Sequence, residues 1–156
     1  MFRPMRRYKQ QLSQEKCEEL LQTMPRGVLA LLGDDGYPYT VPMDFVYADG
    51  KIYFHCARTG HKIDAIQNYD KASFCVMDEG FRREGEWALN ISSVIVFGRI
   101  RIVEEHEKVM HYVRLLGLKY HPDAESVEKE LQKTENRVCC LELIPEHISG
   151  KLVNES

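Results

Sequence analysis

The sequence lacks several features that would assign it to a class at once. No apolar run approaches the ~20 residues of a membrane-spanning helix, and no apolar stretch follows the basic N-terminus, so we expect no signal peptide. The 10 glycines and 6 prolines are too few for a fibrous or low-complexity chain. A net charge of −3 without a long run of Lys or Arg argues against a general nucleic-acid-binding surface. The 156 residues, 44% of them hydrophobic, are instead typical of a single domain spanning 1–156.

The five cysteines, Cys17, Cys56, Cys75, Cys139 and Cys140, contain no CxxC pair. Their odd number argues against a disulfide framework, and their spacing fits no metal site, so we expect no metal. Most lie among apolar neighbours and are interpreted as small core side chains. Cys139 and Cys140 are neighbours on a strand, so their side chains point to opposite faces and pair poorly with each other. These observations predict a reduced, cytoplasmic protein.

Hydrophobic periodicity predicts a largely antiparallel sheet with helices outside it. Ser13 can cap a helix that runs to about Met24, because apolar residues recur there at helical spacing. Asp49-Gly50 is a strong hairpin signal between two alternating segments. We expect strands over 27–32, 37–48, 51–57, 72–77, 87–103 and 138–144, and helices over 14–24, 63–68, 104–120 and around 124–131. The pattern predicts a mainly β (α+β) fold, a six-stranded antiparallel barrel with peripheral helices, preceded by an extended arm over 1–11.

The motifs GxSxG, GxxxxGK[ST], HExxH and GxGxxG are all absent. The most informative stretch is 53–62, where a strand leads into a Thr59-Gly60 turn and a helix begins directly after it. The unpaired N–H groups of a helix start bind anions, and Arg58, His61 and Lys62 add positive charge. The stretch therefore fits a phosphate site without a Walker motif. The alternative is a basic, solvated turn in which Thr59 is an ordinary N-cap.

Two further features are candidates for a site. His55 faces away from Phe54 and Cys56 and could act as a general acid near pH 7, although its residue type and position alone favour a hydrogen-bonded structural histidine. The segment 37–44 holds two prolines within a strand. They free backbone groups that could hold a flat heterocycle, or they protect an edge strand from aggregation.

Taken together, these residues resemble the FMN-binding split barrels of the pyridoxamine 5'-phosphate oxidase-like family, and most closely its 5-nitroimidazole-resistance (Nim-type) branch. The resemblance covers about residues 5–151. It rests on GVLA at 27–30, DDGYPYTVPMDFVYADGKIYFHCARTGHKIDAI at 34–66, SVIVFGRIRIV at 93–103 and ISGK at 148–151. It implies a homodimer with FMN at the subunit interface. The segment 87–92 departs from the pattern, because many relatives carry a Thr and a Tyr there.

The resemblance also implies which residues hold the cofactor. One strand would face the isoalloxazine ring with its backbone, the next strand and turn would hold the ribityl chain and phosphate, and the long strand would lie near the cleft and the dimer contact. In that order these residues are Thr40, Val41, Pro42, Met43 and Asp44; Phe54, His55, Cys56, Ala57, Arg58, Thr59, Gly60, His61 and Lys62; and Ser92 and Ser93. His55 matches a histidine beside the flavin and is our candidate catalytic residue.

Two functions from different classes remain open. The first is an FMN-dependent oxidoreductase that reduces a small, electron-poor substrate such as a nitroaromatic or nitroimidazole, with His55 supplying a proton. The alternative is a non-enzymatic flavin-binding protein, either a redox sensor or a store. A pyridoxamine-phosphate-oxidase-type enzyme ranks lowest, because the chain is short for one and that enzyme's substrate-phosphate residues are not found.

Overall fold

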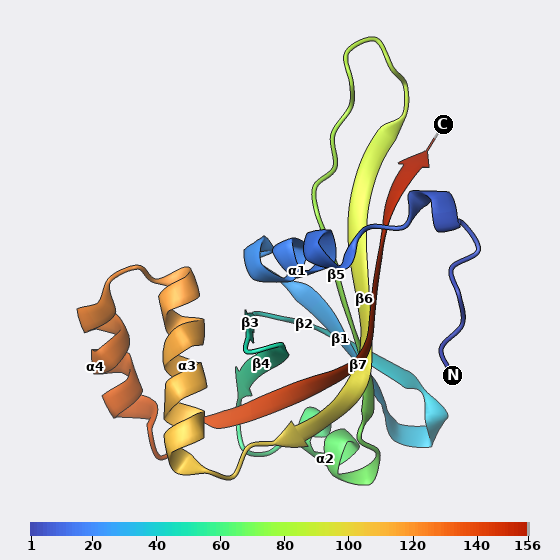
Figure 1. The fold of residues 1–156 in the computed structure, drawn as a ribbon. Coiled ribbons are helices and arrows are strands. Elements are labelled where there is room, and N and C mark those ends of the chain that lie inside the picture. The colour runs from blue at the N-terminus through green and yellow to red at the C-terminus, as the bar shows by residue number, and fades with distance from the viewer. Residues whose placement is uncertain (156) are drawn as a thin grey trace.

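The structure, a computed structural model, describes residues 1–155 around one seven-stranded sheet (Figure 1). The strands are β1 (Gly27–Leu32), β2 (Pro38–Met43), β3 (Val46–Ala48), β4 (Lys51–Cys56), β5 (Lys71–Met77), β6 (Leu89–Ile102) and β7 (Cys139–Glu155). The helices are α1 (Gln14–Thr23), α2 (His61–Asn68), α3 (His106–Tyr120) and α4 (Ala124–Thr134), with short 3-10 turns η1 (Tyr8–Gln10) and η2 (Asp34–Gly36). None of the helices in this described range is long and apolar enough to cross a membrane. The mainly β fold with peripheral helices is confirmed, but the sheet has seven strands and not six.

The two edges of the sheet meet at one corner. The strand order is β2-β1-β5-β6-β7-β4-β3, and all neighbouring strands are antiparallel. The edge strands β2 and β3 follow each other in the chain with only Asp44 and Phe45 between them. Three residue steps, from Met43 to Val46, span at most about 11 Å, so the sheet must curl until its edges approach. Phe45 is fully buried at this corner, with its ring 4.8 Å from that of Phe74.

Two strands differ from their expected ranges for identifiable reasons. The strand expected over 37–48 is divided into β2 and β3, because Asp44 and Phe45 turn the corner between the sheet edges. The strand expected over 138–144 continues to Glu155. Pro145 does not end it, because the register with β6 shifts there between Phe97 and Gly98. A bulge is a position where a strand tolerates a residue without an N–H.

Alternation along β4 and β7 separates two apolar clusters. Phe54 and Leu141 point into the barrel, where α1 adds Cys17, Leu20 and Leu21. Ser13 caps α1 as expected, accepting a hydrogen bond from the Lys16 amide at 3.2 Å. Tyr53 and Cys140 point outward, toward the cluster formed by α3 and α4. His55 shares this outward face, because side chains two residues apart on a strand point the same way.

Candidate functional site

A groove of about 780 Å³ lies between the α3–α4 hairpin and the end of β4. His55 and Cys56 line it from β4, and Asp44 lines it from the corner where the sheet edges meet. The opposite wall is helical and includes Tyr120 of α3 and Arg137, which follows α4. A volume of roughly 300–1,000 Å³ is typical of small-molecule sites. The groove therefore brings three of the predicted site residues together in a space that fits a small ligand.

Asp44 and His55 lie near each other at the end of the β3–β4 hairpin. Asp44 is two residues before Val46, which pairs with Tyr53, two residues before His55, and both Asp44 and His55 line the groove. Burial by the groove walls lowers the pKa of His55, and the Asp44 carboxylate partly opposes this by favouring the charged ring. His55 is therefore a neutral imidazole at pH 7, with one donor and one acceptor nitrogen. Asp44 is held by Arg26, whose Nε lies 2.9 Å from its Oδ1.

Helix α2 starts without a side-chain cap. Its N-cap is Gly60, and no side chain accepts a hydrogen bond from its first turn. Gly60 has φ +132°, a conformation that favours glycine. A Cβ at this position would meet no atom within 4 Å, so the space over the helix start is open on this chain. Thr59 is not the N-cap, and the simple N-cap interpretation of this turn is therefore wrong.

The charged side chains of the turn divide between two neighbours. Burial raises the pKa values of the thiols of Cys56 and Cys139. Lys62 opposes this rise at Cys56, and Arg58 opposes it at Cys139, so each cation lies near one of the thiols. Arg58 also lines a second hollow, of about 390 Å³. His61 turns away and stacks on Tyr39 of β2, with ring centroids 4.0 Å apart. Arg58 and Lys62 thus flank the helix start from the β4 side, whereas His61 packs against the β1–β2 hairpin.

The strand expected to face a flat ring is an edge of the sheet. Among residues 1–155, β2 pairs only with β1, so it leaves one row of backbone groups without a strand partner. Thr40 and Pro42 are exposed, Val41 is half-buried, and Met43 lies in the core. This position is compatible with both interpretations of the proline-containing strand, the protected edge and the backbone ligand site.

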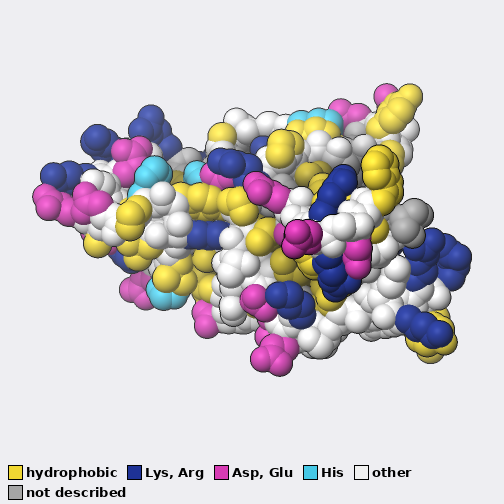
Figure 2. Space-filling view, turned by 90° about the horizontal axis from the view of Figure 1, so that it is seen from above, with side chains coloured by type: hydrophobic (Ala, Val, Ile, Leu, Met, Phe, Trp, Pro, Cys, Tyr) yellow, Lys and Arg dark blue, Asp and Glu magenta, His cyan; other side chains and the backbone are white. Residues whose placement is uncertain are grey.

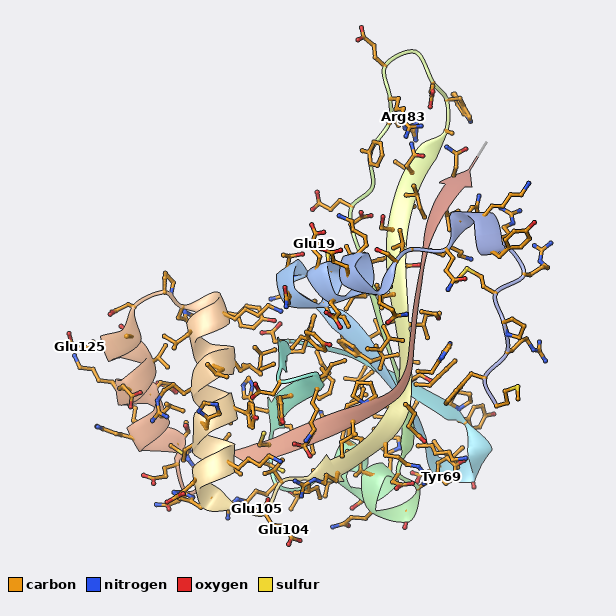
Figure 3. The ribbon with its side chains drawn as sticks, in the orientation of Figure 1. Glu19, Tyr69, Arg83, Glu104, Glu105 and Glu125 are labelled. Atoms are coloured by element: carbon orange, nitrogen blue, oxygen red, sulfur yellow. The ribbon has the colours of Figure 1, made fainter. Side chains whose placement is uncertain are left out.

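Ser92 and Ser93 lie far from the groove within one chain. His55 pairs with Cys140 of β7, and Ser93 pairs with Lys151 of the same strand. At ~3.3 Å per residue, roughly 35 Å of strand separates these two positions. Ser92 is buried and its amide donates to Asp78 Oδ1 at 2.9 Å. In Figure 3, Arg83, in the loop before β6, lies near the upper end of the molecule, and Tyr69, directly after α2, lies near the lower end.

The helical wall of the groove was missed by sequence reasoning. The periodicity of α3 and α4 assigns their apolar residues to packing, but it does not show that the hairpin folds back onto β4. One signal was available in Gly117, inside the expected helix. A Cβ there would lie 2.9 Å from Cγ1 of Val127, so this glycine permits the close approach of α4.

The sequence matches the family model described as Pyridoxamine 5'-phosphate oxidase over residues 13–152. The chain belongs to the pyridoxamine 5'-phosphate oxidase family. The match covers most of the strands and helices that build the barrel and the groove. The family resemblance inferred from the residues is thereby confirmed. No curated protein sequence matches the chain.

Solved structures share the fold of this family member. A candidate 5-nitroimidazole antibiotic resistance protein from Bacteroides thetaiotaomicron is 17% identical, with a TM-score of 0.78, covering 92% of this chain and 87% of that one. A conserved hypothetical protein from Mycobacterium tuberculosis is 19% identical, with a TM-score of 0.80 and coverages of 95% and 90%. An FAD-binding protein from Mesorhizobium loti is 24% identical, with a TM-score of 0.65 and coverages of 92% and 96%. At these identities the likeness shows the fold alone, and that fold is the split barrel.

Proposed function

We propose that the protein binds FMN and acts as an oxidoreductase toward a small, electron-poor aromatic substrate of the nitroaromatic or nitroimidazole type. The observation that carries the proposal is the uncapped start of α2, open above Gly60 and flanked by Arg58 and Lys62. Backbone amides and cations are the donor set that a phosphate monoester prefers. Family membership and the FAD-binding relative support a flavin.

When bound, the flavin supplies the two-electron chemistry, and the protein supplies binding and orientation. The neutral His55 presents a proton donor to the groove that Asp44 also lines. The Arg26–Asp44 pair holds that carboxylate in place. The α3–α4 hairpin forms the wall of the groove opposite His55. These residues suit a reaction in which a reduced aromatic product takes up a proton from the protein.

We further propose a homodimer with the cofactor at its interface. Val28, Ile95 and Phe97 are 37–41% exposed on the outer face of β1, β5 and β6, and Val28 and Ile95 lie in one row through Cys75. Such an apolar sheet face suits an isologous contact. On the face shown in Figure 2, acidic and basic side chains are intermixed, so this face does not favour a partner of one particular charge. Ser93 would reach the groove only from a second copy.

The oligomeric state is measurable by light scattering at micromolar concentration. The expected mass is twice that of the 18.2 kDa chain. A mass of one chain, with and without FMN, would contradict the dimer.

Lys62→Ala tests the phosphate turn. One charge-assisted hydrogen bond contributes roughly 1.5–3 kcal/mol, so FMN binding should weaken about ten- to a hundredfold. Riboflavin, which lacks the phosphate, should bind the variant and the parent equally. The exposed Lys71, at the start of β5, supplies the matched control Lys71→Ala, which should leave both affinities unchanged. Unchanged FMN affinity in Lys62→Ala, or an equal loss of riboflavin, would show that this turn does not hold the phosphate.

The catalytic part of the proposal needs a separate test. Protein loaded with FMN is reduced anaerobically with dithionite and mixed with a nitroimidazole. Stoichiometric reoxidation, faster than that of free reduced FMN, is expected of an oxidoreductase. Reoxidation no faster than in the protein-free control would instead favour a non-enzymatic flavin-binding protein.

A further inference from the structure

Two of the five cysteines face each other across adjacent strands. Cys56 ends β4, Cys139 begins β7, and the two are direct partners in the antiparallel ladder. Directly opposed residues share a face, with Cα atoms about 4.5–5.5 Å apart. Disulfides form at Cα separations of about 4.4–6.8 Å. Directly opposed partners of this kind therefore fall within the range of Cα separations at which a disulfide forms.

The same register leaves the other cysteines out. Cys140 pairs with His55 and points to the opposite face, into the Tyr53 cluster, where it is 1% exposed. Cys17 is fully buried in α1. Cys75 lies in β5, which β6 separates from β7 and β4 in the sheet. Each of the two thiols influences the pKa of the other, which places their sulfurs close together. The fold thus selects one pair from five thiols whose spacing in the sequence selects none.

The pair lies between two hollows. Cys56 lines the groove of about 780 Å³, and Cys139 lines the hollow of about 390 Å³, so a small reagent can approach from either side. Burial raises the pKa of Cys56 to about 12 and also raises that of Cys139, while Lys62 and Arg58 act in the opposite direction. Because the thiolate is the reacting species, the pair is slow to oxidise at neutral pH and faster at higher pH.

We propose that Cys56 and Cys139 are a redox-active pair that converts between a dithiol and a cross-strand disulfide, with a peroxide as oxidant. The Cys56 thiolate attacks one peroxide oxygen, which leaves a sulfenic acid on Cys56 and releases hydroxide that is protonated to water. The Cys139 sulfur then attacks the Cys56 sulfur, and the hydroxyl departs with the Cys139 proton as a second water. Two thiols lose two electrons, the peroxide gains them, and an external dithiol restores the reduced pair.

The disulfide has a defined structural consequence. It joins the end of β4 to the start of β7, and β4 leads directly into the turn that carries Arg58 and Lys62. The oxidation state of the pair therefore decides whether the base of this turn is held by hydrogen bonds alone or by a covalent bond. The pair forms this bond whether or not a cofactor occupies the turn.

Peptide mapping of the folded, full-length chain tests the proposal. The protein is treated with hydrogen peroxide, its remaining thiols are blocked, and it is digested with trypsin without reduction. Cleavage yields peptide 52–58, with Cys56, and peptide 138–151, with Cys139 and Cys140. The expected product is these two peptides joined and two hydrogen atoms lighter than their sum, lost on adding dithiothreitol. It should form roughly a hundredfold faster at pH 9 than at pH 7, since the thiolate fraction rises with pH below the pKa.

Matched variants identify which cysteines form the cross-link. Cys140→Ser should keep the cross-link, whereas Cys139→Ser and Cys56→Ser should each abolish it. Circular dichroism checks that each variant is folded, and fragmentation of the joined peptide from the parent protein identifies the linked sulfur without any variant. A link through Cys140, a bond between Cys139 and Cys140, a bond between two chains, or no link even with the thiol oxidant diamide would each overturn the proposal.

Discussion

Replacing Glu142 by glutamine should destabilise the fold in a pH-dependent way. Glu142 is 1% exposed. It accepts hydrogen bonds from Tyr53 Oη at 2.7 Å, Lys108 Nζ at 2.7 Å and Arg101 Nε at 2.8 Å. Burial by itself raises the pKa of this carboxyl, but the three donors outweigh it and hold the pKa at about 2. One carboxylate of β7 therefore ties α3 to β4 and β6.

The pKa difference sets the expected size of the effect. The ordinary value is 4.5 and the folded value is about 2, which at about 1.36 kcal/mol per unit corresponds to about 3 kcal/mol. Because the folded pKa is the lower one, the unfolded chain takes up the proton first as the pH falls. The contribution is complete above pH 4.5 and is lost between pH 4.5 and about 2. Glu142→Gln keeps the shape and removes the charge, so it should cost about 3 kcal/mol at pH 7 and little at pH 2.

Urea unfolding of the parent and of Glu142→Gln, at steps from pH 7 to pH 2, measures this difference. The matched control is Glu105→Gln, which removes an exposed partner 3.6 Å from Arg101. An exposed ion pair of this kind contributes less than about 1 kcal/mol. If the gap between the parent and Glu142→Gln stays constant as the pH falls, the carboxylate does not stabilise the fold through its charge, and the reasoning from the pKa fails.

Two further changes test other parts of the barrel. Gly98→Ala places a Cβ 2.2 Å from the Ile144 carbonyl oxygen at the bulge, so we expect a loss of several kcal/mol of stability. The control Gly36→Ala lies in open space at φ +78° and should cost only about 1 kcal/mol. Similar losses for the two variants in thermal unfolding would count against a packed bulge. Burial lowers the pKa of Lys119 to about 8, against the opposing effect of Asp44. The folded chain therefore releases this proton first, and stability should rise as the pH increases from about 8 to 10.5. Lys119→Met should remove that rise in urea unfolding, and an unchanged slope would contradict it.

Most of the barrel was predictable because its signals are local. Alternating residues and the Asp49-Gly50 turn define β3 and β4 from a few neighbouring positions. The division of the strand over 37–48 was not predictable, because Asp44 and Phe45 turn where two edges of the finished sheet meet. The extension of β7 past Pro145 depends on the bulge at Glu146 in β7, opposite Phe97 and Gly98 of β6, a residue pairing set by the fold and not by the local sequence.

The candidate site divides in the same way. The helix start after Gly60 is a local feature, and the Thr59-Gly60 turn was enough to predict it, but the residue types alone did not decide whether Thr59 caps the helix or leaves it open. The facing of Cys56 and Cys139 depends on the register between β4 and β7, which no spacing in the sequence encodes. The helical wall of the groove depends on where the α3–α4 hairpin packs, for which the sequence offered only Gly117.

The corner that closes the barrel also positions the chemistry. The end of α3 is attached to this corner: Lys119 Nζ donates to the carbonyls of Met24, at 2.8 Å, and Phe45, at 2.9 Å, and Tyr120 Oη accepts from the Phe45 amide at 3.0 Å. Asp44, the residue before Phe45, lines the groove together with His55. The contacts that bring the sheet edges together therefore also set the distance between the helical wall, the Asp44 carboxylate and the His55 ring. Barrel closure and groove geometry depend on the same few hydrogen bonds, so a change at Lys119 should alter both the stability of the fold and the pKa of His55.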